Sequence, residues 1–134
     1  MVSSLIAQKR NQDGSPASAH DSWNPHPIQG WTPDFIPLVL QESIDKKYFD
    51  LNIPVSGEDG IYWSHQLARN EGIITGISGG STFAVAMKIA EKAEDGANIL
   101  CMLADTAERY LTSVLFEMID SEMNDEENEI LNSI

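Results

Sequence analysis

The stretch GISGGSTFAVAMKIA, residues Gly76 to Ala90, places a Gly/Ser turn directly before a run of small apolar residues. Phe83, Ala84, Met87 and Ala90 recur at the spacing of one helix face, which predicts a helix over residues 81–94. Backbone N–H groups at the start of such a helix are available to an anion or a polar ligand atom. A tight turn with only a structural role is the alternative, because the stretch matches neither the Walker pattern nor the dinucleotide fingerprint.

The segments on both sides of this stretch predict alternating strands and helices. Alternating polar and apolar residues indicate one strand, and a near-continuous apolar run indicates a buried parallel strand. The order predicts an α/β layered fold with a parallel sheet. The expected elements are a short helix near 34–43, a strand over 47–56, a turn at 57–60, a helix over 61–71 that stops at Gly72, a strand over 98–103 and a helix over 107–119.

The composition restricts the kinds of partner and the compartment. The 134 residues fit one domain, and a net charge of -13 argues against nucleic-acid binding, because phosphate contacts need clustered Lys and Arg. No run reaches the roughly 18 apolar residues of a membrane span, and Met1 to Arg10 lack the apolar core of a signal peptide. We therefore expect a protein of the cytoplasm that binds neither nucleic acid nor membranes.

Few side chains point to chemistry by themselves. Cys101 is the only cysteine and lies in the apolar run NILCML, which favours a buried free thiol over a nucleophile. His26 has no carboxylate near it in the sequence to orient it, so we expect it to form a structural hydrogen bond. We assign no catalytic residue and no metal ligand.

Three blocks of sequence, in this order, carry a resemblance to a known family: HPIQGWTPDFIP, then RNEGIITGISGGSTFAVAMKIA, then ILCMLADTAERYLTSVLF. Together they resemble the C-terminal part of the cysteine synthase (O-acetylserine sulfhydrylase) family, which are pyridoxal phosphate-dependent enzymes of fold type II. The resemblance implies part of a three-layer α/β/α domain with a small, mainly parallel sheet, as in the larger domain of these enzymes. It assigns residues 25–119 to this domain, 1–24 to a loop-rich leading segment and 120–134 to an acidic tail.

The same resemblance implies a set of cofactor-binding residues. The family's G-I-S serine corresponds to Ser78, whose hydroxyl would hydrogen-bond the pyridine nitrogen of pyridoxal phosphate. A neutral hydroxyl does not protonate that nitrogen as an aspartate would, which suits β-elimination and β-replacement. Taken without its neighbours, Ser78 is better explained as a cap of the following turn. The implied cofactor-binding residues are Ser78, Gly76, Gln29, Gly30 and Asp105.

The resemblance also identifies what these 134 residues do not contain. In the family, the lysine that binds the cofactor covalently, the substrate loop and the phosphate loop all precede the matched part. None of the chain's five lysines lies in a sequence like the one that surrounds this lysine in the family. None lies in a setting that would lower the pKa of its ammonium group. They are Lys9, Lys46, Lys47, Lys88 and Lys92.

Two interpretations follow for function. In the first, the chain is the C-terminal portion of a cysteine synthase, which replaces the acetate of O-acetylserine with sulfide. It would be inactive alone, and it would need an N-terminal half or a homo-oligomer partner to bind its amino-acid substrate. In the second, the chain is a non-catalytic interaction or regulatory module that pairs with a full-length relative.

Overall fold

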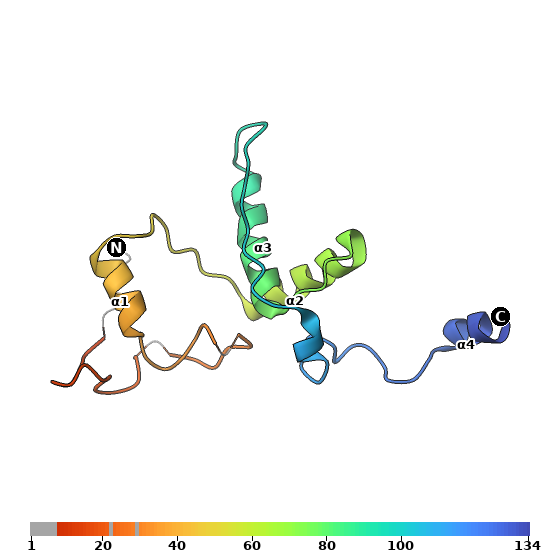
Figure 1. Ribbon diagram of the computed structural model, residues 1–134, viewed down its shortest axis with the longest axis horizontal. Helices are drawn as coiled ribbons and strands as arrows, with labels where there is room; N and C mark the ends of the chain where they lie inside the picture. Colours follow the sequence, from red (N-terminus) through yellow and green to blue (C-terminus); the bar gives the residue numbers. More distant parts are fainter. Residues whose placement is uncertain (1–7, 22, 29) are drawn as a thin grey trace.

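A computed structural model describes residues 8–21, 23–28 and 30–134 as an open arrangement of short helices joined by extended segments (Figure 1). Helices α2 and α3 cross at the centre, α1 lies with the N-terminal loops on one side, and α4 ends an extended tail on the other (Figure 1). Within these ranges, none of the helices combines the length and apolar character that a membrane span needs. The elements are α1 (Leu38–Asp45), α2 (Gly57–Gln66), the π-helical turn η1 (Leu67–Glu71), α3 (Ile77–Ala90), the 3-10 turn η2 (Ala107–Tyr110) and α4 (Asp125–Asn132).

Helix α2 and η1 confirm the predicted helix over 61–71, but α2 begins four residues earlier. The Ser56 hydroxyl accepts a hydrogen bond from the backbone N–H of Asp59 at 3.0 Å, so the predicted turn at 57–60 is the first helical turn. The Asp59 carboxylate also accepts a hydrogen bond from the Lys88 ammonium of α3 at 2.9 Å, which holds the pKa of Asp59 below its ordinary value. Gly72 ends η1 in the left-handed conformation (φ 67°), as its position in the sequence predicts.

Helix α3 begins at Ile77, so the GISGGS stretch forms the start of the helix rather than a turn before it. The reason is the crossing with α2, where small residues let the two backbones approach. A Cβ atom added to Gly80 would lie 2.0 Å from the Gly60 carbonyl oxygen and 2.2 Å from the Ser64 hydroxyl. The Ser64 hydroxyl in turn donates to the carbonyl oxygens of Gly60 (2.9 Å) and Gly76 (3.0 Å). Close packing therefore explains the glycines and serines of this stretch.

The predicted parallel sheet does not form in the described part of the chain. Residues 49–56 and 98–103 form no strand, Lys47 lies in a turn with φ 54°, and Leu100 is 99% exposed. Backbone groups of a strand are satisfied by a neighbouring strand, and the described residues supply none for either segment. An isolated antiparallel bridge joins Thr75 to Thr106. Both strand predictions are therefore wrong for this structure.

The predicted helix over 107–119 is also wrong, because only its first turn, η2, is helical. Leu115, which is 1% exposed, packs in the core with Ile28, Ile77 and Ala107. The backbone carbonyl of Leu115 lies 2.6 Å from Nε2 of His65 on α2. This carbonyl therefore makes a tertiary contact instead of a hydrogen bond within a helix. This small core joins residues from all three sequence blocks at the N-terminus of α3.

The two outer helices differ from the sequence expectations at their boundaries. Helix α1 begins at Leu38, directly after Pro37, rather than near residue 34. Helix α4 was not predicted, and it begins with a capping box in which Asn124 and Glu127 bond each other's backbone N–H groups.

Candidate functional site

The three sequence blocks meet around a cavity of about 590 Å³ at the N-terminus of α3. A volume of this size lies within the range of small-molecule sites, roughly 300–1,000 Å³. The segment before α1, the first turn of α3 and the segment that follows residue 103 each contribute to its wall. Its lining includes Ile28, Gly30, Trp31, Ser78, Asp105, Tyr110 and Ser113.

The predicted site residues occupy different positions relative to this cavity. Gly30, Ser78 and Asp105 line it together. Gly76 lies behind two of the lining side chains: a Cβ atom at this position would be 2.4 Å from Oδ1 of Asp105 and 2.4 Å from Cε2 of Tyr110. Gly76 therefore allows the close approach of Asp105 and Tyr110 rather than lining the cavity itself. Gln29 lies outside the described residues.

Ser78 presents a hydroxyl that the fold leaves available. The residue is 7% exposed, and in the described ranges no hydrogen bond occupies its hydroxyl. The hydroxyl of Ser81, by contrast, donates to the carbonyl oxygen of Ile77 at 2.9 Å. Ser78 also lies in the first turn of α3, where backbone N–H groups have no partner within the helix. Together these groups can bind a polar ring atom or an anion.

Asp105 and Tyr110 form a hydrogen-bonded pair on the facing wall. The Tyr110 hydroxyl donates to Oδ2 of Asp105 at 2.5 Å, and Thr75 Oγ1 donates to the Asp105 backbone carbonyl at 3.1 Å. Oδ1 of Asp105 is buried and has no hydrogen-bond partner in the part of the chain that the structure describes. The hydrogen bond to Asp105, together with burial and the carboxylate charge, raises the pKa of Tyr110 above its ordinary value of 10.0. The pairing of Tyr110 with Asp105 depends on the η2 turn, so the sequence alone does not indicate it.

Replacing Tyr110 with phenylalanine tests this pair. We expect Tyr110→Phe to lower the free energy of unfolding by about 2 kcal/mol near pH 8, because it leaves the half-buried Asp105 carboxylate without its donor. Since the folded-state pKa of Tyr110 is raised, its contribution is complete below pH 10.0 and is lost as the pH rises through the folded pKa. Urea unfolding at several pH values measures both effects, and a constant difference between the two proteins from pH 8 to pH 12 would contradict the assignment.

The cavity fits the non-covalent contacts of pyridoxal phosphate but not its covalent attachment. The Ser78 hydroxyl, the N-terminus of α3 and the half-buried Asp105 line a space large enough for a substituted pyridine ring. None of the five lysines, all of which the structure describes, lines the cavity. Lys46 pairs with Glu42 at 2.5 Å on α1, and Lys88 pairs with Asp59. The described residues also contain no group of His, Cys, Asp and Glu that could hold a metal ion.

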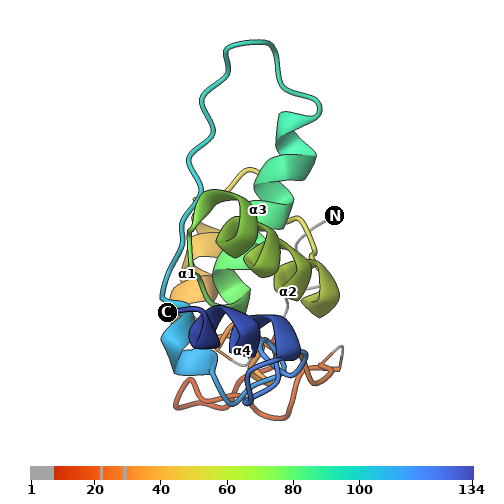
Figure 2. The same ribbon diagram turned by 90° about the vertical axis from the view of Figure 1, so that its right-hand side faces the viewer.

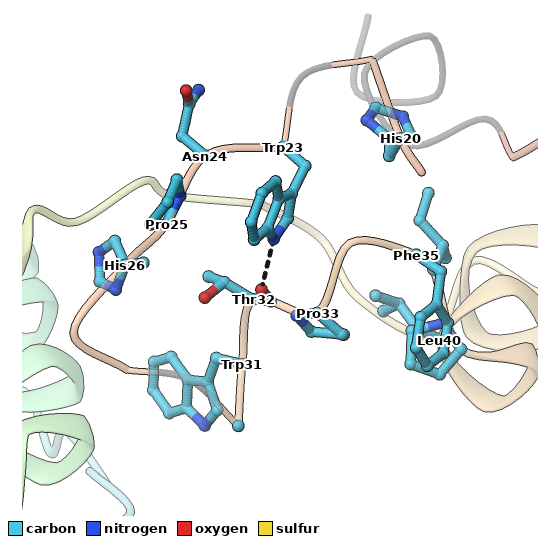
Figure 3. Close-up of a pocket in the computed structure, with 13 residues that line it drawn as sticks. His20, Trp23, Asn24, Pro25, His26, Trp31, Thr32, Pro33, Phe35 and Leu40 are labelled. Atoms are coloured by element: carbon cyan, nitrogen blue, oxygen red, sulfur yellow. Dashed lines mark hydrogen bonds between the residues drawn. The ribbon is translucent and has the colours of Figure 1, made fainter. Parts of the chain in front are cut away.

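A second cavity of about 650 Å³ lies in the proline-rich segment before α1 (Figure 3). Its walls are mainly aromatic and aliphatic side chains. The Trp23 indole N–H donates to the Thr32 carbonyl oxygen at 2.9 Å, which holds the Trp23 ring in the wall (Figure 3). His26 also lines this cavity, and its Nδ1 accepts a hydrogen bond from the Ile28 backbone at 3.1 Å, in keeping with a structural role. Of the predicted site residues that the structure describes, only Gly30 lines it, so the cavity at α3 is the candidate site.

Comparison with known proteins identifies relatives of the chain. No family model matches it. The chain is 43% identical to O-ureido-L-serine synthase of Streptomyces lavendulae over 107 residues, which are 80% of this chain and 32% of the relative. It is 35% identical to a probable cysteine synthase of Bacillus subtilis over 106 residues, which are 79% of this chain and 33% of the relative.

The solved structures that superpose on the chain carry the same enzyme names as these relatives. The crystal structure of an O-ureido-L-serine synthase superposes with a TM-score of 0.69 at 42% identity, over 78% of this chain and 32% of the other. A cysteine synthase from Entamoeba histolytica superposes with a TM-score of 0.64 at 30% identity, over 87% of this chain and 32% of the other. These matches support the α/β fold class, although the described residues form no sheet themselves. The chain spans about one third of the length of the relatives it matches, and over that span it belongs to the cysteine synthase family of pyridoxal phosphate-dependent enzymes.

Proposed function

We propose that the chain forms one wall of the cofactor site in a β-replacement enzyme of the cysteine synthase type. The reaction would replace the acetate of O-acetylserine with sulfide and give cysteine, in the cytoplasm. One observation carries the proposal: Gly30, Ser78 and Asp105, which are far apart in the sequence, line a single cavity of about 590 Å³ in a chain related to cysteine synthases.

Each residue of this wall would have a distinct task. Pyridoxal phosphate, when bound, supplies the electron sink that a β-replacement needs. The Ser78 hydroxyl would hydrogen-bond the ring nitrogen without protonating it. Asp105, held by Tyr110, would keep the segment after residue 103 against the start of α3. Gly30 would let the ring lie close to the backbone.

We further propose that the 134-residue chain has no activity alone. A covalent bond to the cofactor requires a lysine beside the cavity, and the chain's five lysines all lie away from it. A second polypeptide segment would supply the lysine and the phosphate-binding loop. The C-terminal position of the matched blocks in the family supports this division.

A chimera tests the proposal directly. In the O-ureido-L-serine synthase of S. lavendulae, the matched third would be replaced by the matching residues of this chain. We expect the purified chimera to retain pyridoxal phosphate through gel filtration and to form cysteine from O-acetylserine and sulfide. The chain alone should do neither. A folded chimera without cofactor would contradict the proposal.

A second candidate function is a non-catalytic module that pairs with a full-length relative. The observation that favours it is the set of exposed apolar side chains along α1 and the segment near residue 100, including Val39 and Leu100. Light scattering of the chain mixed with a full-length cysteine synthase distinguishes this function, because it requires a defined complex of the two proteins.

A further inference from the structure

The sequence contains three Asp-Gly pairs, and the structure places them in three different surroundings. In such a pair the glycine backbone nitrogen can attack the aspartate side chain, because glycine has no Cβ atom that hinders the approach. The attack succeeds only when the glycine N–H and the aspartate carboxyl group are both free of other partners. The pairs are Asp13-Gly14 in the N-terminal loops, Asp59-Gly60 in the first turn of α2 and Asp95-Gly96 in the loop after α3.

The reaction converts aspartate into isoaspartate through a cyclic succinimide. The glycine nitrogen forms a bond to Cγ of the aspartate, while the C–OH bond of the carboxyl group breaks and the hydroxyl leaves as water with the N–H proton. A water molecule then opens the ring. Opening at Cγ restores aspartate, whereas opening at the main-chain carbonyl carbon leaves the backbone running through the side chain. The product is isoaspartate, which has an additional methylene group in the backbone and a free α-carboxylate.

The pair Asp13-Gly14 is held by hydrogen bonds on both of its reacting groups. The Gly14 N–H donates to the Asn11 carbonyl oxygen at 3.0 Å. Oδ1 of Asp13 accepts hydrogen bonds from the Ser15 backbone N–H at 2.9 Å and from the Ser15 hydroxyl at 2.6 Å. The nitrogen and the carboxyl group of this pair are therefore directed away from each other's reaction.

The pair Asp59-Gly60 is held by helix α2 and by its contact with α3. The Gly60 N–H donates to the Ser56 carbonyl oxygen at 3.2 Å, in the first turn of α2. Oδ2 of Asp59 accepts a hydrogen bond from the Lys88 ammonium at 2.9 Å. Attack at this pair would require both contacts to break and the helix to open.

The pair Asp95-Gly96 lies in a loop that projects beyond the end of α3, away from the other helices (Figures 1 and 2). The Ala97 N–H donates to the Glu94 carbonyl oxygen at 3.1 Å, which forms a β-turn around the pair. Both residues of the pair are exposed, and among the described residues the Gly96 N–H and the Asp95 carboxyl group have no hydrogen-bond or ionic partner. Gly96 has φ 86°, and apart from its chain neighbours no atom lies within 4 Å of the position of a Cβ atom. The approach of the nitrogen to the carboxyl group is therefore open.

We propose that Asp95-Gly96 is a site of isoaspartate formation in the folded chain, and that the fold protects Asp13-Gly14 and Asp59-Gly60 from the same reaction. Water is the only reagent. The free α-carboxylate of the product lies on an exposed turn, where a protein isoaspartate methyltransferase can esterify it with the methyl group of S-adenosylmethionine.

Timed incubation of the whole chain at neutral pH tests the proposal. Mass spectrometry of the digested protein, with fragmentation that distinguishes isoaspartate from aspartate, gives the rate at each pair, and methyl transfer from S-adenosylmethionine gives the total. We expect isoaspartate to form at residue 95 at least about tenfold faster than at residues 13 and 59, because their hydrogen bonds must open before they react. In concentrated guanidinium chloride the three rates should become similar. Equal rates in the folded chain would overturn the proposal, and so would a difference that persists after unfolding.

A matched pair of variants shows whether residue 95 is the source. Asp95→Glu keeps the charge but lengthens the side chain, which disfavours ring closure, and Asp13→Glu makes the same change at a protected pair. We expect Asp95→Glu to remove most of the isoaspartate that the folded chain forms and Asp13→Glu to leave the amount unchanged. Asp95→Asn should form isoaspartate through the same ring with release of ammonia. Far-UV circular dichroism verifies the fold of each variant, and equal accumulation in Asp95→Glu and Asp13→Glu would contradict the assignment.

Discussion

Replacing Gly80 with alanine is expected to disrupt the crossing of α2 and α3. The new Cβ atom would lie 2.0 Å from the Gly60 carbonyl oxygen and 2.6 Å from the Ser64 backbone nitrogen. These are backbone atoms, which cannot rotate away as the end of a flexible side chain can. Overpacking of this kind costs about 3 kcal/mol or more, which is a large part of the stability of a small domain. We therefore expect Gly80→Ala to unfold at a much lower urea concentration than the unaltered chain.

The matched control for this variant is Gly30→Ala. No atom lies within 4 Å of a Cβ at Gly30, and its φ is not in the left-handed region. Its effect on the free energy of unfolding should stay within about 1 kcal/mol. Urea titration followed by far-UV circular dichroism measures both variants. Similar unfolding midpoints for the two would mean that the close crossing of α2 and α3 is not what requires glycine at position 80.

Truncation of Leu115 to alanine is expected to have the second large effect. Leu115 is 1% exposed and packs against Ile28, Ile77 and Ala107, which come from three different parts of the sequence. Removing its side chain leaves a cavity at the point that joins these parts, at a cost of about 3 kcal/mol. Thermal unfolding measures this loss.

The control for Leu115→Ala is Leu111→Ala, in the same segment. Leu111 is 64% exposed, so its truncation should change stability by no more than about 0.5 kcal/mol. If both variants melted at the same temperature, the buried core around Leu115 would not be what holds the third sequence block in place.

The central helices could be predicted from the sequence, but the start of α3 could not. Apolar spacing and Gly72 locate α2, η1 and most of α3 correctly. Glycine and serine are poor helix formers, so Gly76 to Ser81 indicate a turn by local propensity. Tertiary contact overrides that propensity, because the crossing with α2 needs small residues inside the helix.

The strand predictions failed for a different reason. Residues 47–56 and 98–103 have strand-like composition, yet a strand forms only against a neighbour. Local pattern cannot tell whether that neighbour belongs to the chain. Helix α4 lies in a segment whose acidic composition indicates an exposed tail, although Asn124 and Glu127 have capping-box spacing.

The candidate site could be predicted in part. The resemblance to cysteine synthases singled out Gly30, Ser78 and Asp105, which the structure brings to one cavity. It could not indicate that Gly76 makes room for Asp105 and Tyr110, because that contact depends on how the segment after residue 103 turns back on α3.

The affinity of the chimera for pyridoxal phosphate, measured with and without the Ser78 hydroxyl, tests the central claim most directly. Thr112→Ala is the matched control, because it removes a hydroxyl from an exposed position in the third sequence block. We expect Ser78→Ala to weaken cofactor binding about tenfold, the value of one hydrogen bond, while Thr112→Ala binds as the unaltered chimera does. Equal affinities for all three proteins would contradict the claim that GISGGS positions Ser78 against the cofactor.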